Sequence, residues 1–567
     1  MDTRVQSNNK YLEVIKKFTR ECPGIPEYEE RLERELKIIY EKKFTDYILK
    51  ICEILELIKD VPHIIRGSSG SSLVCFLLGI TDIDPIKEKI CFARFLNEYR
   101  NSMPDIDMDF PHNKRDKIFE KIFNKWENVV RISNHVLYGH KSAIRQALKE
   151  MGVKGRVPKE KCNVNYFSDA EKKEELKEKI ENLKGTLKNY SLHCGGIIFY
   201  SNPEQIIKDK IKDRQVSWNK VATEKNGFFK IDILSNRGLS QLMGINSKPL
   251  LEYDFADKKT IELLKSGNNI GLTFAESPAM RKILTTFKPK TVQDIAICLA
   301  VIRPGASKDE AETIEDLNSN IVFDDDAIYY IKDLLKCDED KADSIRRLYS
   351  KNDKNKIGQF ELDLYTSNPS LDIDEISDKL VNLRKYSFCK SHALSYAYLV
   401  WALAYQKANN PKEFWKSTVS NCSSMYREWV YKREAILTGP GLGLGLGLEY
   451  KSESELDNQA HYYKYGYWLG NNFIDSDMYV DITNEKTLTC VFRGLIACSR
   501  WYKKYNKTTK KYDYVTFVTI GYKNSTYIDI TVKGWIGIKN KNICSGKGKL
   551  KLTNGYASIN ADEIVYK

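Results

Sequence analysis

The segment MPDIDMDF, residues 103–110, carries three aspartates at alternate positions: Asp105, Asp107 and Asp109. Residues two apart in a β-strand project from the same face, so the three carboxylates would line one side of a strand. The positions between them are apolar: Ile106, Met108 and Phe110. Aspartate is a poor strand former, and like charges on one face repel each other. The pattern therefore predicts bound cations, with an acidic edge strand facing solvent as the alternative.

A second apolar segment, FFKIDIL, residues 228–234, holds a single carboxylate, Asp232. A lone aspartate in an apolar strand is usually a hydrogen-bonded structural residue. Beside the first cluster, however, Asp232 becomes a candidate third ligand. Three carboxylates could hold two Mg²⁺ ions about 3.5–4 Å apart, an arrangement that stabilises the attacking and leaving oxygens of phosphoryl transfer.

The loop RGSSGSS, residues 66–72, fits that chemistry. Its glycines allow close backbone approach, and its serine hydroxyls and amides can donate hydrogen bonds. We expect a helix to open near Ser71, and the N-terminus of a helix favours anions. Because this loop precedes the aspartate strand by about 35 residues, we expect a triphosphate site, with a plain linker as the alternative.

Cationic residues further along the chain could complete the site. Arg303 lies in AVIRPGA, and Lys390 and His392 lie in FCKSHALSY. Guanidinium and ammonium groups stabilise charge on a transferring phosphoryl group. A turn arginine and a helix-capping KSH are the structural alternatives.

Composition indicates a globular, polyanion-binding protein. Of 567 residues, 42% are hydrophobic and 29% charged, and 90 lysines and arginines outnumber 77 aspartates and glutamates. Residues 485–567 hold 16 basic and 5 acidic residues, a net charge of +11, which suggests a polyanion partner, although a lysine-rich solubilising surface is the alternative. The thirteen scattered cysteines predict reduced thiols in a cytoplasmic protein. No apolar run is long enough to span a membrane.

The coarse pattern along the chain alternates helical and β-rich regions. Apolar stripes predict two helices within residues 27–59, and residues 111–190 and 240–435 look mainly helical. The Gly-Leu repeats of residues 439–450 predict a boundary or hinge. After residue 485, alternating segments with aromatic residues and lysines predict a small barrel of the oligonucleotide-binding (OB) type.

Taken in order, nine motifs resemble the alpha subunit of bacterial DNA polymerase III, the C-family of replicative polymerases. They run from about residue 28 to 414: YEERLERELKII, RGSSGSSLVCFLLGITDIDPI, FARFLNEYRNSMPDIDMDF, HCGGIIF, FFKIDIL, ESPAMRKIL, AVIRPGA, KADSIRRLYSK and FCKSHALSYAYLVWALAYQKANNPKEF. The resemblance implies a multidomain α+β protein with a polymerase beta-like nucleotidyltransferase palm, a helical thumb, helical fingers and an OB-like C-terminal barrel. The expected segments are N-terminal helices and first palm segment 1–110, thumb 111–190, second palm segment 191–240, fingers 241–438, linker 439–484 and basic β domain 485–567.

The resemblance also implies roles for individual residues. The catalytic and metal-binding residues would be Asp105, Asp107 and Asp232, with Asp109 a neighbour. The nucleotide would be bound by Arg66, Gly67, Ser68, Ser71, Arg303, Lys390 and His392, with Arg281 and Arg347 as further candidates. The DNA backbone would contact Lys141 and Arg145 in the thumb and Lys503 and Lys504 in the tail, without reading sequence.

The resemblance therefore implies a template-directed DNA polymerase that acts in DNA replication. It would extend a primer 3′-hydroxyl with deoxynucleoside triphosphates (dNTPs), using two Mg²⁺ ions. A minimal form without the family's PHP domain is expected, acting at the nucleoid or a viral replication site. A sliding clamp and a separate proofreading exonuclease are further expected partners. The alternatives are a non-catalytic paralogue that binds primed DNA and recruits replication proteins, and a template-independent nucleotidyltransferase.

Overall fold

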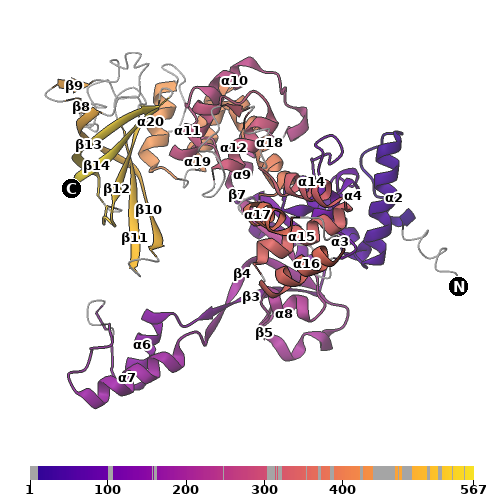
Figure 1. The fold of residues 1–567 in the computed structure, drawn as a ribbon, viewed down its shortest axis with the longest axis horizontal. Coiled ribbons are helices and arrows are strands. Elements are labelled where there is room, and N and C mark those ends of the chain that lie inside the picture. Colours follow the sequence, from indigo (N-terminus) through magenta and orange to yellow (C-terminus); the bar gives the residue numbers. More distant parts are fainter. Residues whose placement is uncertain are drawn as a thin grey trace.

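The computed structural model is a multidomain α+β protein (Figure 1). It describes residues 11–99, 106–155, 157–158, 162–246, 248–302, 313–314, 316, 322–352, 354–367, 372–383, 388–421, 425–438, 467–469, 472–474, 488–506, 511–521, 527–538, 541–553 and 556–566. Within these ranges, none of the helices is long and apolar enough to cross a membrane. Cys75 and Cys298 are buried free thiols.

The N-terminal part is built on a seven-stranded sheet with the order β1-β2-β7-β4-β3-β6-β5. Its strands are β1 (Ile64–Arg66), β2 (Ile106–Pro111), β3 (Val129–Leu137), β4 (Leu187–Phe199), β5 (Lys210–Lys212), β6 (Gln215–Val216) and β7 (Ile231–Asn236). The accompanying helices are α2 (Pro26–Glu41), α3 (Thr45–Leu57), α4 (Leu73–Leu77), α5 (Arg115–Lys125), α6 (His140–Glu150), α7 (Ala170–Leu183) and α8 (Lys220–Lys225).

The apolar residues of β2 and β7 pack into one core with α2, α3 and α5. The buried members include Ile106, Met108, Phe110, Ile231 and Ile233. The predicted apolar side of the aspartate strand is therefore confirmed. The two helices predicted within residues 27–59 are also confirmed as α2 and α3, whose apolar stripes are buried in the same core.

Residues 111–190 are less helical than predicted. Strand β3 lies within them and pairs with β4 as an antiparallel ribbon. Figure 1 shows this ribbon leaving the sheet and carrying α6 and α7 at its far end. The polar, exposed residues at the outer half of β3, such as Asn134 and His135, hid its strand character from a reading based on apolar alternation.

Residues 237–438 form a helical region, in which no strand occurs among the described residues. The helices are α9 (Arg237–Met243), α10 (Lys258–Lys265), α11 (Pro278–Phe287), α12 (Val292–Val301), α14 (Asp324–Leu335), α15 (Glu339–Lys351), α16 (Lys354–Ser367), α17 (Ile373–Leu383), α18 (Lys390–Asn409), α19 (Pro411–Ser420) and α20 (Glu428–Thr438). Helix α18 is buried along most of its length, and its Trp401 side chain is fully buried in the core of the helical region.

The C-terminal part is a second seven-stranded sheet. It contains β8 (Tyr467–Leu469), β9 (Asn472–Ile474), β10 (Leu488–Asn506), β11 (Lys511–Gly521), β12 (Tyr527–Lys533), β13 (Ile543–Thr553) and β14 (Tyr556–Tyr566). The two alternating segments predicted to be strands correspond to β11 and β12. The long strand β10 pairs with β13 through its first half and with β11 through its second half. The remaining pairings, β11–β12, β12–β14 and β13–β14, close a five-stranded circuit. The predicted boundary at residues 439–450 lies outside the described residues.

The C-terminal sheet docks on the helical region through buried polar contacts at β12. The Tyr527 hydroxyl donates to Glu434 Oε1 of α20 at 2.6 Å, and the Arg433 guanidinium lies 4.6 Å from the centre of the Tyr527 ring. Glu434 is 2% exposed. A buried carboxylate needs such donors because desolvation is costly.

We expect Tyr527→Phe to lower the free energy of unfolding by about 2 kcal/mol, because the buried Glu434 carboxylate loses a donor. Thermal unfolding followed by calorimetry would measure the change. Tyr512→Phe is the matched control, since Tyr512 is 51% exposed and should change stability by less than about 0.5 kcal/mol. Equal effects of the two substitutions would contradict a docking role for Tyr527.

Candidate active site

Four adjacent strands, β1, β2, β7 and β4, bring one residue each into a single row across the first sheet. Arg66 of β1 pairs with Asp107 of β2, Asp107 pairs with Asp232 of the parallel strand β7, and Asp232 pairs with Gly196 of β4. Parallel neighbours in register place their side chains on the same face. Two carboxylates from segments 125 positions apart are thus neighbours.

The two carboxylates of the row are substantially buried. Burial and the facing Asp232 together raise the pKa of Asp107 to about 7, although Arg66 and Lys230 partly oppose the rise. A second charge beside a desolvated carboxylate makes ionisation more difficult. In the absence of a cation, the pair therefore favours a protonated Asp107 near neutral pH.

Asp232 is held on one side and open on the other. The Lys230 ammonium forms an ion pair with Asp232 Oδ2, and His193 Nδ1 lies 3.6 Å from Oδ1. Asp232 Oδ1 is buried and has no hydrogen-bond partner among the described residues. His193 Nδ1 itself accepts the backbone N–H of Gly196 at 2.8 Å, so its lone pair is directed to the backbone.

Gly196 is required at its position in the row. A Cβ atom there would lie 2.8 Å from both His193 Nδ1 and Ile132 Cγ1. Any side chain would therefore displace the imidazole that borders Asp232 Oδ1.

This carboxylate pair fits a divalent cation. An orphaned, buried carboxylate oxygen next to a second carboxylate is a site for a hard cation with oxygen ligands. No group of three His, Cys, Asp or Glu side chains gathers into a complete metal site in the part of the chain that the structure describes. Asp105, the third expected ligand, lies outside the described residues.

Asp109 is on the same strand face but does not join the pair. Its Oδ2 accepts Asn236 Nδ2 at 2.9 Å and the Tyr396 hydroxyl at 3.0 Å. Its Oδ1 lies 3.4 Å from Arg66 Nε. Burial raises the pKa of Asp109, while these donors lower it. Asp109 is therefore a hydrogen-bonded carboxylate between the sheet and α18.

The Gly/Ser loop forms a tight turn against the start of α18. Gly67 has φ of 85°, a conformation that favours glycine. Its N–H donates to His392 Nδ1 at 3.3 Å, and its carbonyl accepts the Ser391 hydroxyl at 2.8 Å. Ser69 and Ser71 are buried, with hydroxyls that have no hydrogen-bond partner among the described residues.

The expected anion site at the helix after this loop is already occupied by a side chain of the protein. Glu35 of α2 is fully buried and accepts the N–H groups of Leu73 and Val74 at 3.0 and 3.1 Å, and the Ser72 hydroxyl at 2.7 Å. These are first-turn donors of α4, which otherwise attract anions. Glu35 therefore already takes the first-turn donors of α4 that were expected to attract a phosphate. Glu35 was missed because it lies 37 residues before its partner Ser72.

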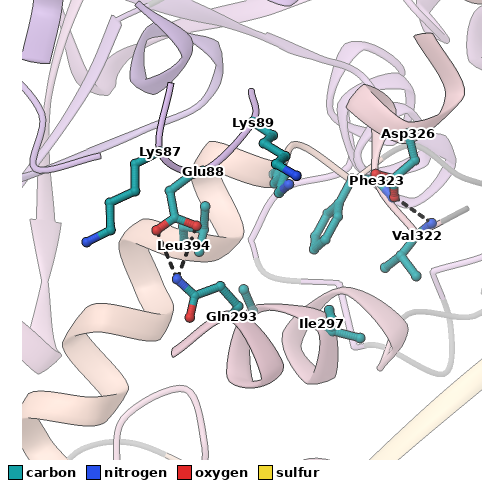
Figure 2. Close-up of a pocket in the computed structure, with 11 residues that line it drawn as sticks. Lys87, Glu88, Lys89, Gln293, Ile297, Val322, Phe323, Asp326 and Leu394 are labelled. Carbon is teal, nitrogen blue, oxygen red and sulfur yellow. Dashed lines mark hydrogen bonds between the residues drawn. The ribbon is translucent and has the colours of Figure 1, made fainter. Parts of the chain in front are cut away.

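Lys390 and His392 point to different faces of α18. His392 contacts the Gly/Ser loop, with Tyr396 one turn further along the same face. Lys390 instead lines a cavity of about 350 Å³, shown in Figure 2, together with Lys87, Lys89, Gln293, Ile297 and Phe323. In that cavity wall Glu88 accepts Gln293 Nε2 at 2.9 Å. The two predicted nucleotide contacts therefore belong to opposite sides of one helix.

The remaining predicted residues lie apart from the carboxylate pair or outside the residues that the structure describes. Arg303 lies outside the described residues. Lys141 and Arg145 lie on α6 at the end of the ribbon, and Lys503 and Lys504 on β10 (Figure 1). Arg281 Nε donates to the carbonyl of Gly267, and Arg347 Nε donates to Asp343; the expected nucleotide contacts of these two arginines stay a prediction.

Four site residues were missed by sequence reasoning: Lys230, His193, Asn236 and Tyr396. Lys230 had a usable signal, because it lies two positions before Asp232 and so on the same strand face. The other three depend on strand pairing and helix packing, which no local pattern encodes.

Comparisons with known proteins assign this region of the chain to two domains. Residues 7–235 match the bacterial DNA polymerase III alpha NTPase domain, and residues 239–367 match the bacterial DNA polymerase III alpha subunit finger domain. DNA polymerase III subunit alpha of Ureaplasma parvum is 30% identical over 467 residues, covering 70% of this chain and 47% of that protein. The subunits of Aquifex aeolicus and Thermotoga maritima are 28% and 27% identical, covering 68% and 69% of this chain and 41% and 46% of theirs. The chain thus spans less than half the length of these curated relatives.

We expect Glu35→Gln to lower the free energy of unfolding by about 3 kcal/mol. The substitution leaves the partly buried Arg31, whose Nε donates to Glu35 at 2.7 Å, without a counter-charge, and it turns an amide toward backbone donors. Urea unfolding would measure it. Glu33→Gln on the exposed face of α2 is the control. A loss no larger than that of Glu33→Gln would contradict the capping role of Glu35.

We expect the stability contribution of Asp107 in metal-free protein to fall as pH rises. Its folded pKa of about 7 exceeds an unfolded value near 3.9, so the contribution is fully present below about pH 3.9 and is lost as pH rises through 7. Asp107→Asn cannot ionise, so its stability relative to the unsubstituted protein should grow by about 1–2 kcal/mol between pH 5.5 and 7.5. Melting curves with a chelator would measure this, and a pH-independent difference would contradict it.

Proposed function

Since the chain is related to the alpha subunits of bacterial DNA polymerase III through two matched domains, we propose that it is a template-directed DNA polymerase. In this proposal the primer 3′-hydroxyl attacks the α-phosphate of a dNTP, and pyrophosphate leaves. The observation that carries the proposal is the in-register pair of Asp107, partly buried, and Asp232, buried, on adjacent parallel strands, a ligand arrangement suited to nucleotidyl transfer.

Divalent cations are generally used by this polymerase family, and we propose two Mg²⁺ ions held by Asp107, Asp232 and Asp105. When bound, they would lower the pKa of the attacking hydroxyl and stabilise charge on the leaving group. Asp107 must lose its proton to become a ligand. The buried Oδ1 of Asp232, which accepts no hydrogen bond from the described residues, is the oxygen best prepared for that role.

The cationic groups around the pair would bind and orient the triphosphate. Arg66 lies 3.6 Å from Asp107 through its Nε, and its outer guanidinium nitrogens would contact phosphate oxygens. We propose Gly67, Ser68, Ser71 and His392 as the surface against which the nucleotide rests, with Lys390 and Arg303 reaching it from the finger domain. Positioned cations act strongly on phosphoryl groups because the site is partly shielded from water.

We further propose that the first sheet is the palm, that the β3–β4 ribbon with α6 and α7 is the thumb, and that the C-terminal circuit is an OB-like barrel. The circuit β10-β11-β12-β14-β13, with β12 and β14 parallel, supports the last assignment. In Figure 1 the β10–β11 end points toward α6 and α7. Duplex DNA would contact Lys141 and Arg145 on the thumb and Lys503 and Lys504 on β10.

Exposed aromatic side chains on β10 support single-strand binding by the same barrel. Trp501 and Tyr502 are 55% and 52% exposed. Aromatic rings that face solvent next to lysines are suited to base stacking. A sliding clamp and a separate proofreading exonuclease complete the proposed set of partners.

We expect the purified protein to extend a primer on a templated substrate with Mg²⁺ and dNTPs. Asp107→Asn and Asp232→Asn should each lower kcat at least about 10³-fold, since each removes a charge next to the reacting phosphate. Asp116→Asn is the control, because the Asp116 side chain is 85% exposed. Extension that survives both substitutions would contradict the mechanism.

The same assay distinguishes the competing functions. Extension of a blunt primer without a template would favour a template-independent nucleotidyltransferase. Tight binding of primed DNA without any extension would favour a non-catalytic paralogue.

A further inference from the structure

Asp109 joins three chain segments that are distant in sequence. It is 3% exposed, and its donors come from the end of β7 (Asn236), from α18 (Tyr396) and from β1 (Arg66). The matched domain models together end at residue 367, so the contact with Tyr396 connects the catalytic strand to a helix beyond them.

Two aromatic contacts hold the Tyr396 ring. Its ring stacks on Phe274 with centroids 4.2 Å apart and planes inclined by 13°. His392 lies against it with ring centroids 4.7 Å apart. Since the His392 imidazole accepts the Gly67 N–H, a shift of Tyr396 would be transmitted to the proposed nucleotide-binding turn.

These contacts close a ring. It runs from Asp109 to Tyr396, to His392, to Gly67, to the adjacent Arg66 and back to Asp109. Each member touches the next by a hydrogen bond, an aromatic contact, a peptide bond or an ion pair. Asp109 is buried and the other members are partly buried, so breaking a contact to Asp109 leaves a buried carboxylate with fewer donors.

The two carboxylates of strand β2 therefore differ in what remains available to a ligand. Both oxygens of Asp109 face donors of the protein, whereas the pair Asp107 and Asp232 retains a buried oxygen without a hydrogen bond from the described residues. A metal ion at Asp109 would have to displace Tyr396, Asn236 or Arg66.

We propose that Asp109 is a positioning residue that fastens helix α18 to the catalytic strand and so sets the geometry of dNTP binding. This inference rests on the proposed polymerase function. The carboxylate fixes Tyr396 and Arg66, and through them the imidazole of His392 and the Gly67 turn. Loss of the carboxylate should then impair nucleotide binding far more than the chemical step at Asp107 and Asp232.

The test compares Asp109→Asn, Tyr396→Phe and the double variant in primer extension, with KM for dNTP and kcat measured separately. We expect each single substitution to raise KM about tenfold and to change kcat less than about threefold. The double variant should be no worse than the more severe single variant, because both substitutions act on the same contact between residues 109 and 396. Additive effects, or a fall in kcat with KM unchanged, would overturn the proposal.

Tyr398→Phe is the matched control. Tyr398 lies on the same helix, is also buried, and its hydroxyl faces a carboxylate, Glu88, at 3.5 Å on the other side of α18. Its KM and kcat should stay within about twofold of the unsubstituted values. A tenfold rise in KM with this variant would mean that any loosening of α18 suffices, which contradicts a specific role for Asp109.

A measurement without catalysis separates this inference from the proposed function. Hydrogen exchange should become at least about tenfold faster at the first turn of α18 and at residues 67–71 in Asp109→Asn and Tyr396→Phe, but not in Tyr398→Phe. If the unsubstituted protein extends no primer, the polymerase proposal fails while exchange still tests the fastening role. Unchanged exchange would overturn that role, and Tyr396→Phe supplies the result if Asp109→Asn does not fold.

Discussion

Two like charges forced together on a buried surface are the constraint on which the site depends. Asp107 and Asp232 are in register on parallel strands, and the strand order leaves them no freedom to separate. Placing two carboxylates side by side at low dielectric is unfavourable unless cations or protons compensate. The neighbouring strands reflect this requirement, since β1 contributes Arg66 to one side and the residue before β7, Lys230, contributes an ammonium.

Some carboxylates around the pair are hydrogen-bonded within the protein, whereas others leave an oxygen available to a ligand. Glu35 fills the N-terminus of α4, and Asp109 is surrounded by donors. Only some carboxylates of this region can therefore bind a cation or a substrate, although the sequence alone does not distinguish them. The buried Asp232 Oδ1 is distinguished by what it lacks among the described residues, not by residue type.

Helix α18 connects the parts of the molecule. One face carries His392 and Tyr396 toward the carboxylate strands, and another carries Lys390 and Leu394, which line the cavity of Figure 2. The remaining sides are packed among apolar residues of the helical region. A helix that is packed among its neighbours cannot move without repacking them. A displacement of α18 at one face therefore also displaces the residues on its other face.

The sequence by itself determined the elements: the aspartate strand with its apolar reverse side, helices α2 and α3, the Gly/Ser turn and the alternating strands β11 and β12. These follow from side-chain periodicity and backbone preference, which are local properties. Motif order also indicated the related polymerase family. Only the tertiary structure decided that Asp232 neighbours Asp107, that Glu35 occupies the helix N-terminus and that Tyr396 bonds Asp109. Those outcomes depend on strand pairing and helix packing between segments as far as 287 positions apart. Local sequence patterns do not specify contacts over such separations.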